Sequence, residues 1–123
     1  MSVEGCQTVI EVTGETTFHA ASRLMSEGVP RPCALNFASA KNPGGGFLNG
    51  SRAQEKCLAR ASGLYPCLLA AEPYYGANRR CGTSLYTEHI IYSPAVPVFR
   101  NDADDLLPTP YSCSILTAPA VNA

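Results

Sequence analysis

The 123-residue sequence has no excess of charge of either sign. Nine lysine and arginine residues balance ten aspartate and glutamate residues, which leaves a formal net charge of −1. Without a basic surplus the chain lacks the field that holds a nucleic-acid backbone, so we expect no direct nucleic-acid partner. No apolar run approaches the length of a membrane span, and the N-terminus has no signal-peptide pattern. We therefore expect a cytoplasmic protein without a membrane partner.

Patterns for metal binding are missing as well. The six cysteines are widely spread without a Cys-x-x-Cys pair, and the two histidines belong to no ligand pattern. We expect no metal site and no cofactor. Because most of the cysteines lie within apolar runs, buried and reduced thiols fit the sequence better than three disulfides.

The composition is that of one small globular domain over residues 1–123. The chain is 46% hydrophobic, which is enough for a core, and strand patterns alternate with helix patterns along it. Predicted strands are Gln7–Val12, Pro32–Phe37, Leu85–Tyr92 and Ser112–Thr117, and predicted helices are Thr16–Ser26 and Ser51–Leu64. Strands interleaved with helices favour a three-layer α/β fold.

Local signals set the expected boundaries. Gly28 ends the first helix, and the second begins at Ser51 as N-cap with Gln54 in the capping-box position. Pro66 should bend or restart that helix. Its buried stripe should contain Ala61, Leu64, Leu68 and Leu69.

Two further segments have readable patterns. The strand at 32–37 is apolar enough to be buried on both faces. Residues 101–105 form an acidic surface turn, which lacks the glycine and terminal glutamate of a calcium loop.

The most informative segment is 42–57. It places Gly44, Gly45 and Gly46 between a predicted strand and a predicted helix, with Glu55 in the first helical turn. Consecutive glycines bring no side chain to a core, but they admit unusual backbone angles and let a ligand reach the main chain. Bare amides beside a helix N-terminus form a concave site for phosphate oxygens. The segment therefore joins a phosphate cradle to a carboxylate.

This segment resembles the signature of the bacterial-type poly(ADP-ribose) glycohydrolases, a macrodomain family with a Gly-Gly-Gly loop followed by Gln-Glu-Glu. The third residue of that triplet is Lys56 here. Further similar segments are 35–38, 58–65, 92–100 and 116–120, so the resemblance runs from Val9 to Ala123. It implies a three-layer macrodomain-like fold that is partial, because family members continue past the equivalent of residue 120 with more helices and strands.

The resemblance also implies roles at the catalytic positions. The family assigns proton transfer to the second glutamate of the triplet, which is Lys56 in this chain. An ammonium group, with a reference pKa of about 10.4, cannot give and take the proton as a carboxyl group of about 4.3 does, and it repels an oxocarbenium ion. Glu55 matches the residue that helps hold the ribose hydroxyls, and it points about 100° away from its neighbour.

The remaining site residues surround the loop. By the same resemblance, the three glycines approach the diphosphate and distal ribose, with Phe47 and Leu48 as apolar wall. Asn36 has two open roles, a hydrogen bond to a ribose hydroxyl or a buried and satisfied amide. Gln54 either caps the helix or touches ligand, and we favour the cap.

The function implied is that of a poly(ADP-ribose) glycohydrolase-like protein, a glycosidase acting on the ribose–ribose O-glycosidic bond, with catalysis impaired by Lys56. The alternative is a noncatalytic ADP-ribose-binding macrodomain. Expected partners are ADP-ribose, or poly(ADP-ribose) on modified proteins. Because the chain stops early, exposed strand edges predict self-association or a complementary C-terminal fragment.

Overall fold

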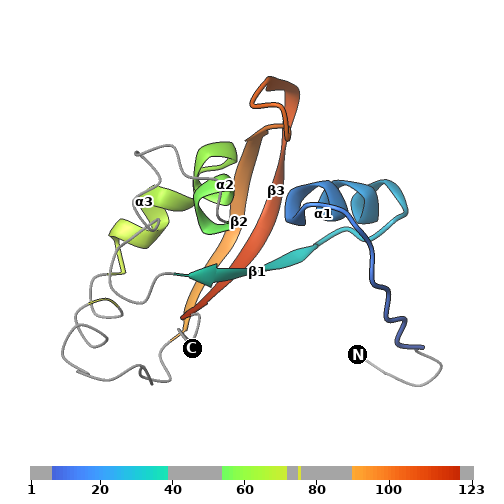
Figure 1. The fold of residues 1–123 in the computed structure, drawn as a ribbon, viewed down its shortest axis with the longest axis horizontal. Helices are drawn as coiled ribbons and strands as arrows, with labels where there is room; N and C mark the ends of the chain where they lie inside the picture. The colour runs from blue at the N-terminus through green and yellow to red at the C-terminus, as the bar shows by residue number, and fades with distance from the viewer. Residues whose placement is uncertain (1–6, 39–53, 72–74, 76–89, 120–123) are drawn as a thin grey trace.

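The computed structural model describes residues 7–38, 54–71, 75 and 90–119. In chain order these residues form α1 (Thr17–Ser26), β1 (Cys33–Ala38), α2 (Gln54–Ala61), α3 (Leu64–Leu69), β2 (Ile91–Arg100) and β3 (Leu106–Pro119). Figure 1 shows β2 and β3 as a long ribbon that β1 crosses near the C-terminal end of β3. None of the described helices is both long and apolar enough to cross a membrane.

The described strands form one mixed sheet in the order β1-β3-β2. β1 pairs in parallel with the C-terminal half of β3, from Cys33 opposite Ser114 to Ala38 opposite Pro119. β2 runs antiparallel to β3 over a longer stretch, so the β2–β3 hairpin extends beyond β1. The predicted strands at 32–37 and 112–117 are confirmed, although β3 begins six residues earlier than expected.

One face of the sheet holds the core. Buried side chains of α1, α2 and α3 form a single cluster with alternate residues of all three strands, so these helices cover the same face. The sheet side of that cluster consists of Ala34, Val96, Val98, Cys113 and Ile115. The described residues therefore supply the sheet and one helical layer of an α/β fold.

The opposite face of the sheet is open. Leu35 lies beside Leu116, and Leu116 lies beside Tyr92, so the three side chains form a row across the strands. All three are exposed, as is Phe37. The expectation that 32–37 is buried on both faces is therefore wrong, because nothing in the described residues covers this side.

The first helix begins within one residue of its predicted start, and Gly28 ends it as predicted. Thr16 is the N-cap, and its hydroxyl accepts a hydrogen bond from the amide of His19. At the other end Gly28 has a φ of 100°, which a residue with a Cβ rarely adopts. The amides of Gly28 and Val29 donate to the carbonyls of Met25 and Leu24, which satisfies the last turn.

The second predicted helix is two helices, and the break is at Ser62 and Gly63 rather than at Pro66. The Ser62 hydroxyl donates to the Leu58 carbonyl and accepts from the Leu64 amide. The Gly63 amide donates to the Pro97 carbonyl of β2, and a Cβ on Gly63 would stand 3.1 Å from the Pro97 ring. Contact with β2 therefore ends α2. Pro66 lies in the first turn of α3, where no amide donor is needed.

Two other expectations need correction, and a third is not tested. Leu69 is half exposed, so it does not belong to the buried stripe that Ala61, Leu64 and Leu68 do form. Residues 7–12 are not a strand: Val9, Ile10 and Val12 are 76%, 87% and 97% exposed. The alternating pattern is present there, but no described strand pairs with it. Ser51 lies outside the described residues, so its capping role remains a prediction.

The last strand predictions differ at their ends. β2 begins at Ile91 and continues to Arg100, past the expected end at Tyr92, while residues 85–89 lie outside the described residues. Within the described sheet it is an edge strand with two register shifts, and Pro94 lies in the first of them, between Ser93 and Val96. The acidic turn at 101–105 is confirmed as the exposed β2–β3 connection.

The thiol prediction is confirmed only in part. None of the described cysteines forms a disulfide, but Cys33 and Cys57 are exposed, Cys67 is half-buried, and among the described cysteines only Cys113 is buried. Cys33 lies on the open face of the sheet, which explains its exposure. Cys6 and Cys81 lie outside the described residues.

Candidate functional site

A buried polar cluster lies at the C-terminal ends of the parallel strands β1 and β3. Asn36 and Thr117 are register partners on these strands, and both are fully buried. Ligands of open α/β sheets bind outside the carboxyl ends of parallel strands. The three glycines follow β1 in the sequence, six residues after its end at Ala38.

Glu55 completes the cluster from the first turn of α2. Its side chain is buried, with 4% of the residue exposed, and its Oε2 accepts a hydrogen bond of 3.0 Å from the Asn36 Nδ2. The helix N-terminus favours a negative charge at this position. A buried carboxylate needs such a partner, because burying a polar group without a hydrogen bond or an opposite charge costs about several kcal/mol.

The Asn36 amide has one side satisfied and one side open. Its Nδ2 also donates to the Thr117 hydroxyl at 3.2 Å, so both amide hydrogens have acceptors. Its Oδ1 is buried and has no hydrogen-bond partner among the described residues. Asn36 is therefore a buried amide with only its nitrogen satisfied, which fits one of the two predicted roles in part, whereas the hydrogen bond to a ribose hydroxyl stays a prediction.

Gln54 ties three elements together. Its Oε1 accepts from the Phe37 amide at 2.8 Å, and its Nε2 donates to the Leu35 carbonyl at 2.9 Å and to the Thr17 hydroxyl at 3.0 Å. Leu35 and Phe37 present these groups on the edge of β1 that does not pair with β3. The sequence analysis favoured a capping role and did not predict these contacts. The described hydrogen bonds of Gln54 hold α2 against β1 and α1.

The other predicted site residues are separated from this cluster or lie outside the described residues. Lys56 is half-buried, whereas its neighbour Glu55 is buried, so the two side chains point in different directions as expected. Gly44, Gly45, Gly46, Phe47 and Leu48 lie outside the described residues, and their roles remain predictions.

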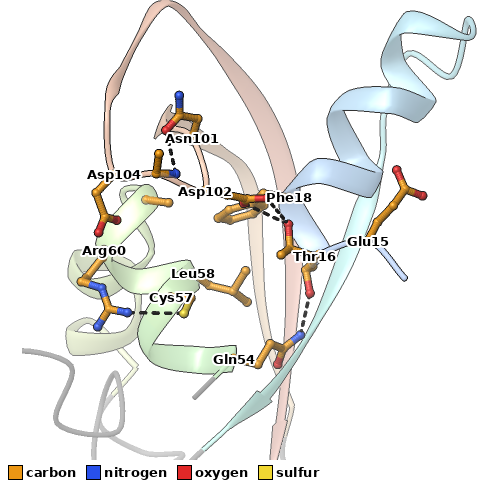
Figure 2. Close-up of a pocket in the computed structure, with 13 residues that line it drawn as sticks. Glu15, Thr16, Phe18, Gln54, Cys57, Leu58, Arg60, Asn101, Asp102 and Asp104 are labelled. Carbon is orange, nitrogen blue, oxygen red and sulfur yellow. Dashed lines mark hydrogen bonds between the residues drawn. The ribbon is translucent and has the colours of Figure 1, made fainter. Parts of the chain in front are cut away.

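A separate cavity of about 940 Å³ lies between the start of α1, the helix α2 and the β2–β3 turn. Figure 2 shows Arg60 beside Cys57 on α2, and Asp102 reaching Thr16 at the start of α1. Gln54 lines this cavity, but the other residues of the buried cluster do not. The charged groups of its lining are the carboxylates of Glu15, Asp102 and Asp104 and the guanidinium of Arg60.

Two of these acidic side chains have partners in the described structure: Glu15 pairs with Arg23, and Asp102 accepts a hydrogen bond from Thr16. The Arg23 guanidinium donates to both carboxylate oxygens of Glu15 at 2.9 Å and holds the pKa of Glu15 below its usual value of 4.5. Arg100 donates to the Arg60 carbonyl at 2.8 Å and so satisfies one carbonyl in the last turn of α2. In the described part of the chain no three side chains are grouped as a metal site would need.

The fold and the cluster define a macrodomain-like α/β protein. Residues 1–101 match the family model described as the microbial-type PARG catalytic domain, where PARG is poly(ADP-ribose) glycohydrolase. No significant match was found among curated proteins.

Solved structures agree with the family model. The PARG of Deinococcus radiodurans in complex with ADP-ribose is 58% identical, with a TM-score of 0.87, over 94% of this chain and 46% of that one. The PARG of Thermomonospora curvata bound to the inhibitor ADP-HPD is 54% identical, with a TM-score of 0.85, over 90% and 42%. Another T. curvata PARG structure is 52% identical, with a TM-score of 0.91, over 98% and 44%.

The chain belongs to the microbial-type PARG family. It is a PARG-like protein with a partial macrodomain-like fold, as the resemblance implied. It spans less than half the length of the solved relatives that it matches.

Sequence analysis missed Thr117 as a site residue. Its segment was recognised as similar to the family, but no role was assigned to it. A signal was present in the alternation of β3, because Cys113, Ile115 and Thr117 must share one face of the sheet. A polar residue in a row of buried apolar ones indicates a hydrogen-bonded partner.

Proposed function

We propose that this chain binds ADP-ribose at the C-terminal ends of β1 and β3, and that it is a poly(ADP-ribose) glycohydrolase-like protein with impaired catalysis. The observation that carries the proposal is the buried pair of Asn36 and Glu55, which are joined by a hydrogen bond of 3.0 Å. In the sequence the two residues flank the three glycines. The relatives solved with ADP-ribose and ADP-HPD support this ligand class.

The pair suits the sugar of the ligand. A carboxylate accepts hydrogen bonds from hydroxyl groups, and the open Asn36 Oδ1 accepts one more. The three glycines would supply amide donors for the diphosphate. In this proposal α2 contributes at its N-terminus, where its dipole favours the negative ligand.

The proposed impairment rests on Lys56. Cleavage of the ribose–ribose bond needs a group that protonates the leaving oxygen and then activates water. Glu55 is a poor replacement, because its carboxylate already accepts the Asn36 amide hydrogen and is buried.

The same observation favours a second function, a noncatalytic ADP-ribose-binding macrodomain. Binding requires the glycine loop and Glu55 but no proton donor at position 56. The two functions differ only in turnover.

The proposal includes ADP-ribose or poly(ADP-ribose) on modified proteins as partners, and a complementary polypeptide or a second copy on the open sheet face. The free thiols fit a reducing compartment, so we place the protein in the cytoplasm.

Calorimetric titration with ADP-ribose, followed by a turnover assay on poly(ADP-ribose), tests this proposal. The parent chain should bind and show at most marginal turnover. Gly45→Val should abolish binding with the fold retained, because a β-branched residue blocks positive φ and close approach. Gly14→Val is the matched control, since a Cβ at Gly14 meets no atom within 4 Å. Absence of binding by the parent, or equal binding by Gly45→Val, would reject the proposed site.

A further inference from the structure

Thr117 of β3 and Glu55 of α2 both accept hydrogen bonds from the Asn36 amide nitrogen. Thr117 and Asn36 come from neighbouring strands, 81 positions apart in the sequence, and neither has any exposed surface. The Asn36 nitrogen carries two hydrogens, of which one points to Glu55 Oε2 at 3.0 Å and the other to Thr117 Oγ1 at 3.2 Å. Two acceptors on different elements therefore fix the plane of one amide.

Each acceptor has its own effect on that amide. An ionised carboxylate is acceptor-only, so Glu55 selects the nitrogen end of the amide rather than the oxygen end. Thr117 then occupies the second hydrogen. If that acceptor were lost, a buried donor would be left unsatisfied, and the amide would gain by rotating away from Glu55. The Asn36 Oδ1, which has no described partner, would turn with it.

We propose that Thr117 is a positioning residue for the ligand-binding carboxylate Glu55 and acts on it through Asn36. The inference rests on the proposed function, since it assigns ligand hydroxyls to the two groups that Thr117 orients. Thr117 itself touches the amide and not the ligand. Its role requires the hydroxyl oxygen, whereas a packing role of this buried residue would require its methyl group.

Two substitutions separate these roles. Thr117→Val keeps the shape and removes the acceptor, whereas Thr117→Ser keeps the acceptor and removes the methyl group. Positioning predicts that Val weakens ADP-ribose binding by about tenfold or more, the effect of one unsatisfied buried donor, and that Ser stays within about threefold of the parent. If Thr117 only packs, Ser is the weaker variant, because it leaves a cavity. That order of the two affinities would overturn the inference.

A double-substitution cycle tests the path through Asn36. In an Asn36→Ala background, Thr117→Val should cause no further loss of ADP-ribose affinity, because the group through which it acts is gone. A tenfold loss that persists in this background would show that Thr117 acts on the site by another route, and would overturn the inference.

A measurement without ligand keeps the inference separate from the proposed function. The side-chain NH₂ of Asn36 should give two distinct, slowly exchanging NMR signals in the parent and in Thr117→Ser, and should lose this protection in Thr117→Val. If the parent binds no ADP-ribose, the proposed function fails, and these signals still decide the inference. Equal protection in the folded Val variant would overturn it. If Thr117→Val does not fold, Thr117→Ala takes its place. Loss of protection in Thr117→Ala with retention in Thr117→Ser would then support the inference, and equal protection in the two variants would overturn it.

Discussion

The Thr16 hydroxyl donates to both carboxylate oxygens of Asp102, each at 2.9 Å. The same oxygen accepts from the His19 amide at 3.2 Å, so one side chain caps α1 and fastens it to the β2–β3 turn. The acidic turn was expected to be only a solvated connection. Its Asp102 instead stands at the positive end of a helix dipole, 86 residues from its partner.

Thr16→Ala should lower the free energy of unfolding by about 1 kcal/mol, the usual effect of losing an N-cap side chain. Asp102→Ala should cost less, about 0.5 kcal/mol or below, because the Thr16–Asp102 contact is exposed. Urea denaturation gives both values. Thr8→Ala, at an exposed position outside the helix, is the control. If Thr16→Ala and Thr8→Ala have the same midpoint, the cap does not contribute as inferred.

The Glu15–Arg23 ion pair predicts a loss of stability in acid. The pKa of Glu15 is lowered below 4.5 first by the hydrogen bond from Arg23. A carboxyl whose pKa is lower in the folded than in the unfolded state stabilises the fold above its unfolded pKa, and this contribution is lost as pH falls through its folded pKa.

Glu15→Gln should therefore lower the urea midpoint at pH 7 and have a smaller effect at pH 3 or below. Glu11→Gln, at an exposed position of the N-terminal segment, serves as the control. A Glu15→Gln effect that is the same at both pH values would show that the ion pair adds nothing beyond the packing of the side chain.

The open sheet face predicts association of the 123-residue chain. Leu35, Leu116 and Tyr92 form an exposed apolar row across three strands, and faces of this kind are covered in stable proteins. Sedimentation should show dimers or larger species at micromolar concentration.

Leu116→Glu should shift that distribution towards monomer, because a buried charge without a partner opposes association. Leu106→Glu is the matched control, since Leu106 is also exposed but lies at the turn end of β3, away from the row. A parent chain that sediments as a folded monomer would contradict the prediction.

Restoring a carboxyl at position 56 should restore turnover. Lys56→Glu supplies the proton donor that the family uses, and general acid catalysis contributes about 10²–10⁴-fold in rate. The assay needs poly(ADP-ribose) and a polypeptide corresponding to the rest of the solved relatives, in the same chain or added separately.

Lys56→Gln separates two effects in this assay, because it removes the positive charge without supplying an acid. The Glu variant should exceed both the Gln variant and the parent. If the parent already turns over substrate at the rate of the Glu variant, then Glu55 is the acid and Lys56 does not impair the chain.

The segments that could be predicted from sequence are those whose causes are local. Gly28 ends α1 as predicted because a positive φ acts within one turn of the helix, and the apolar periodicity predicted the start of α1 to within one residue. The glycine motif and the similar segments around it identified the family, since each is a continuous stretch. The helix also fixed the divergence of Glu55 from Lys56, which follows from the rise and twist of consecutive residues.

Tertiary structure determined the features that depend on contacts between residues far apart in the sequence. Residues 7–12 have the alternation of a strand and remain outside the sheet, because a strand requires a second strand to receive its hydrogen bonds. Gly63 ends α2 because Pro97 approaches it from β2. The register of β1 on β3 brings Asn36 beside Thr117, which is 81 residues away in the sequence, and Glu55, 19 residues away, contacts the same amide from α2. The sequence alone therefore determined the family and the motif residues, whereas strand pairing determined which buried groups hold the carboxylate, because hydrogen bonds between distant residues depend on a register that no local pattern encodes.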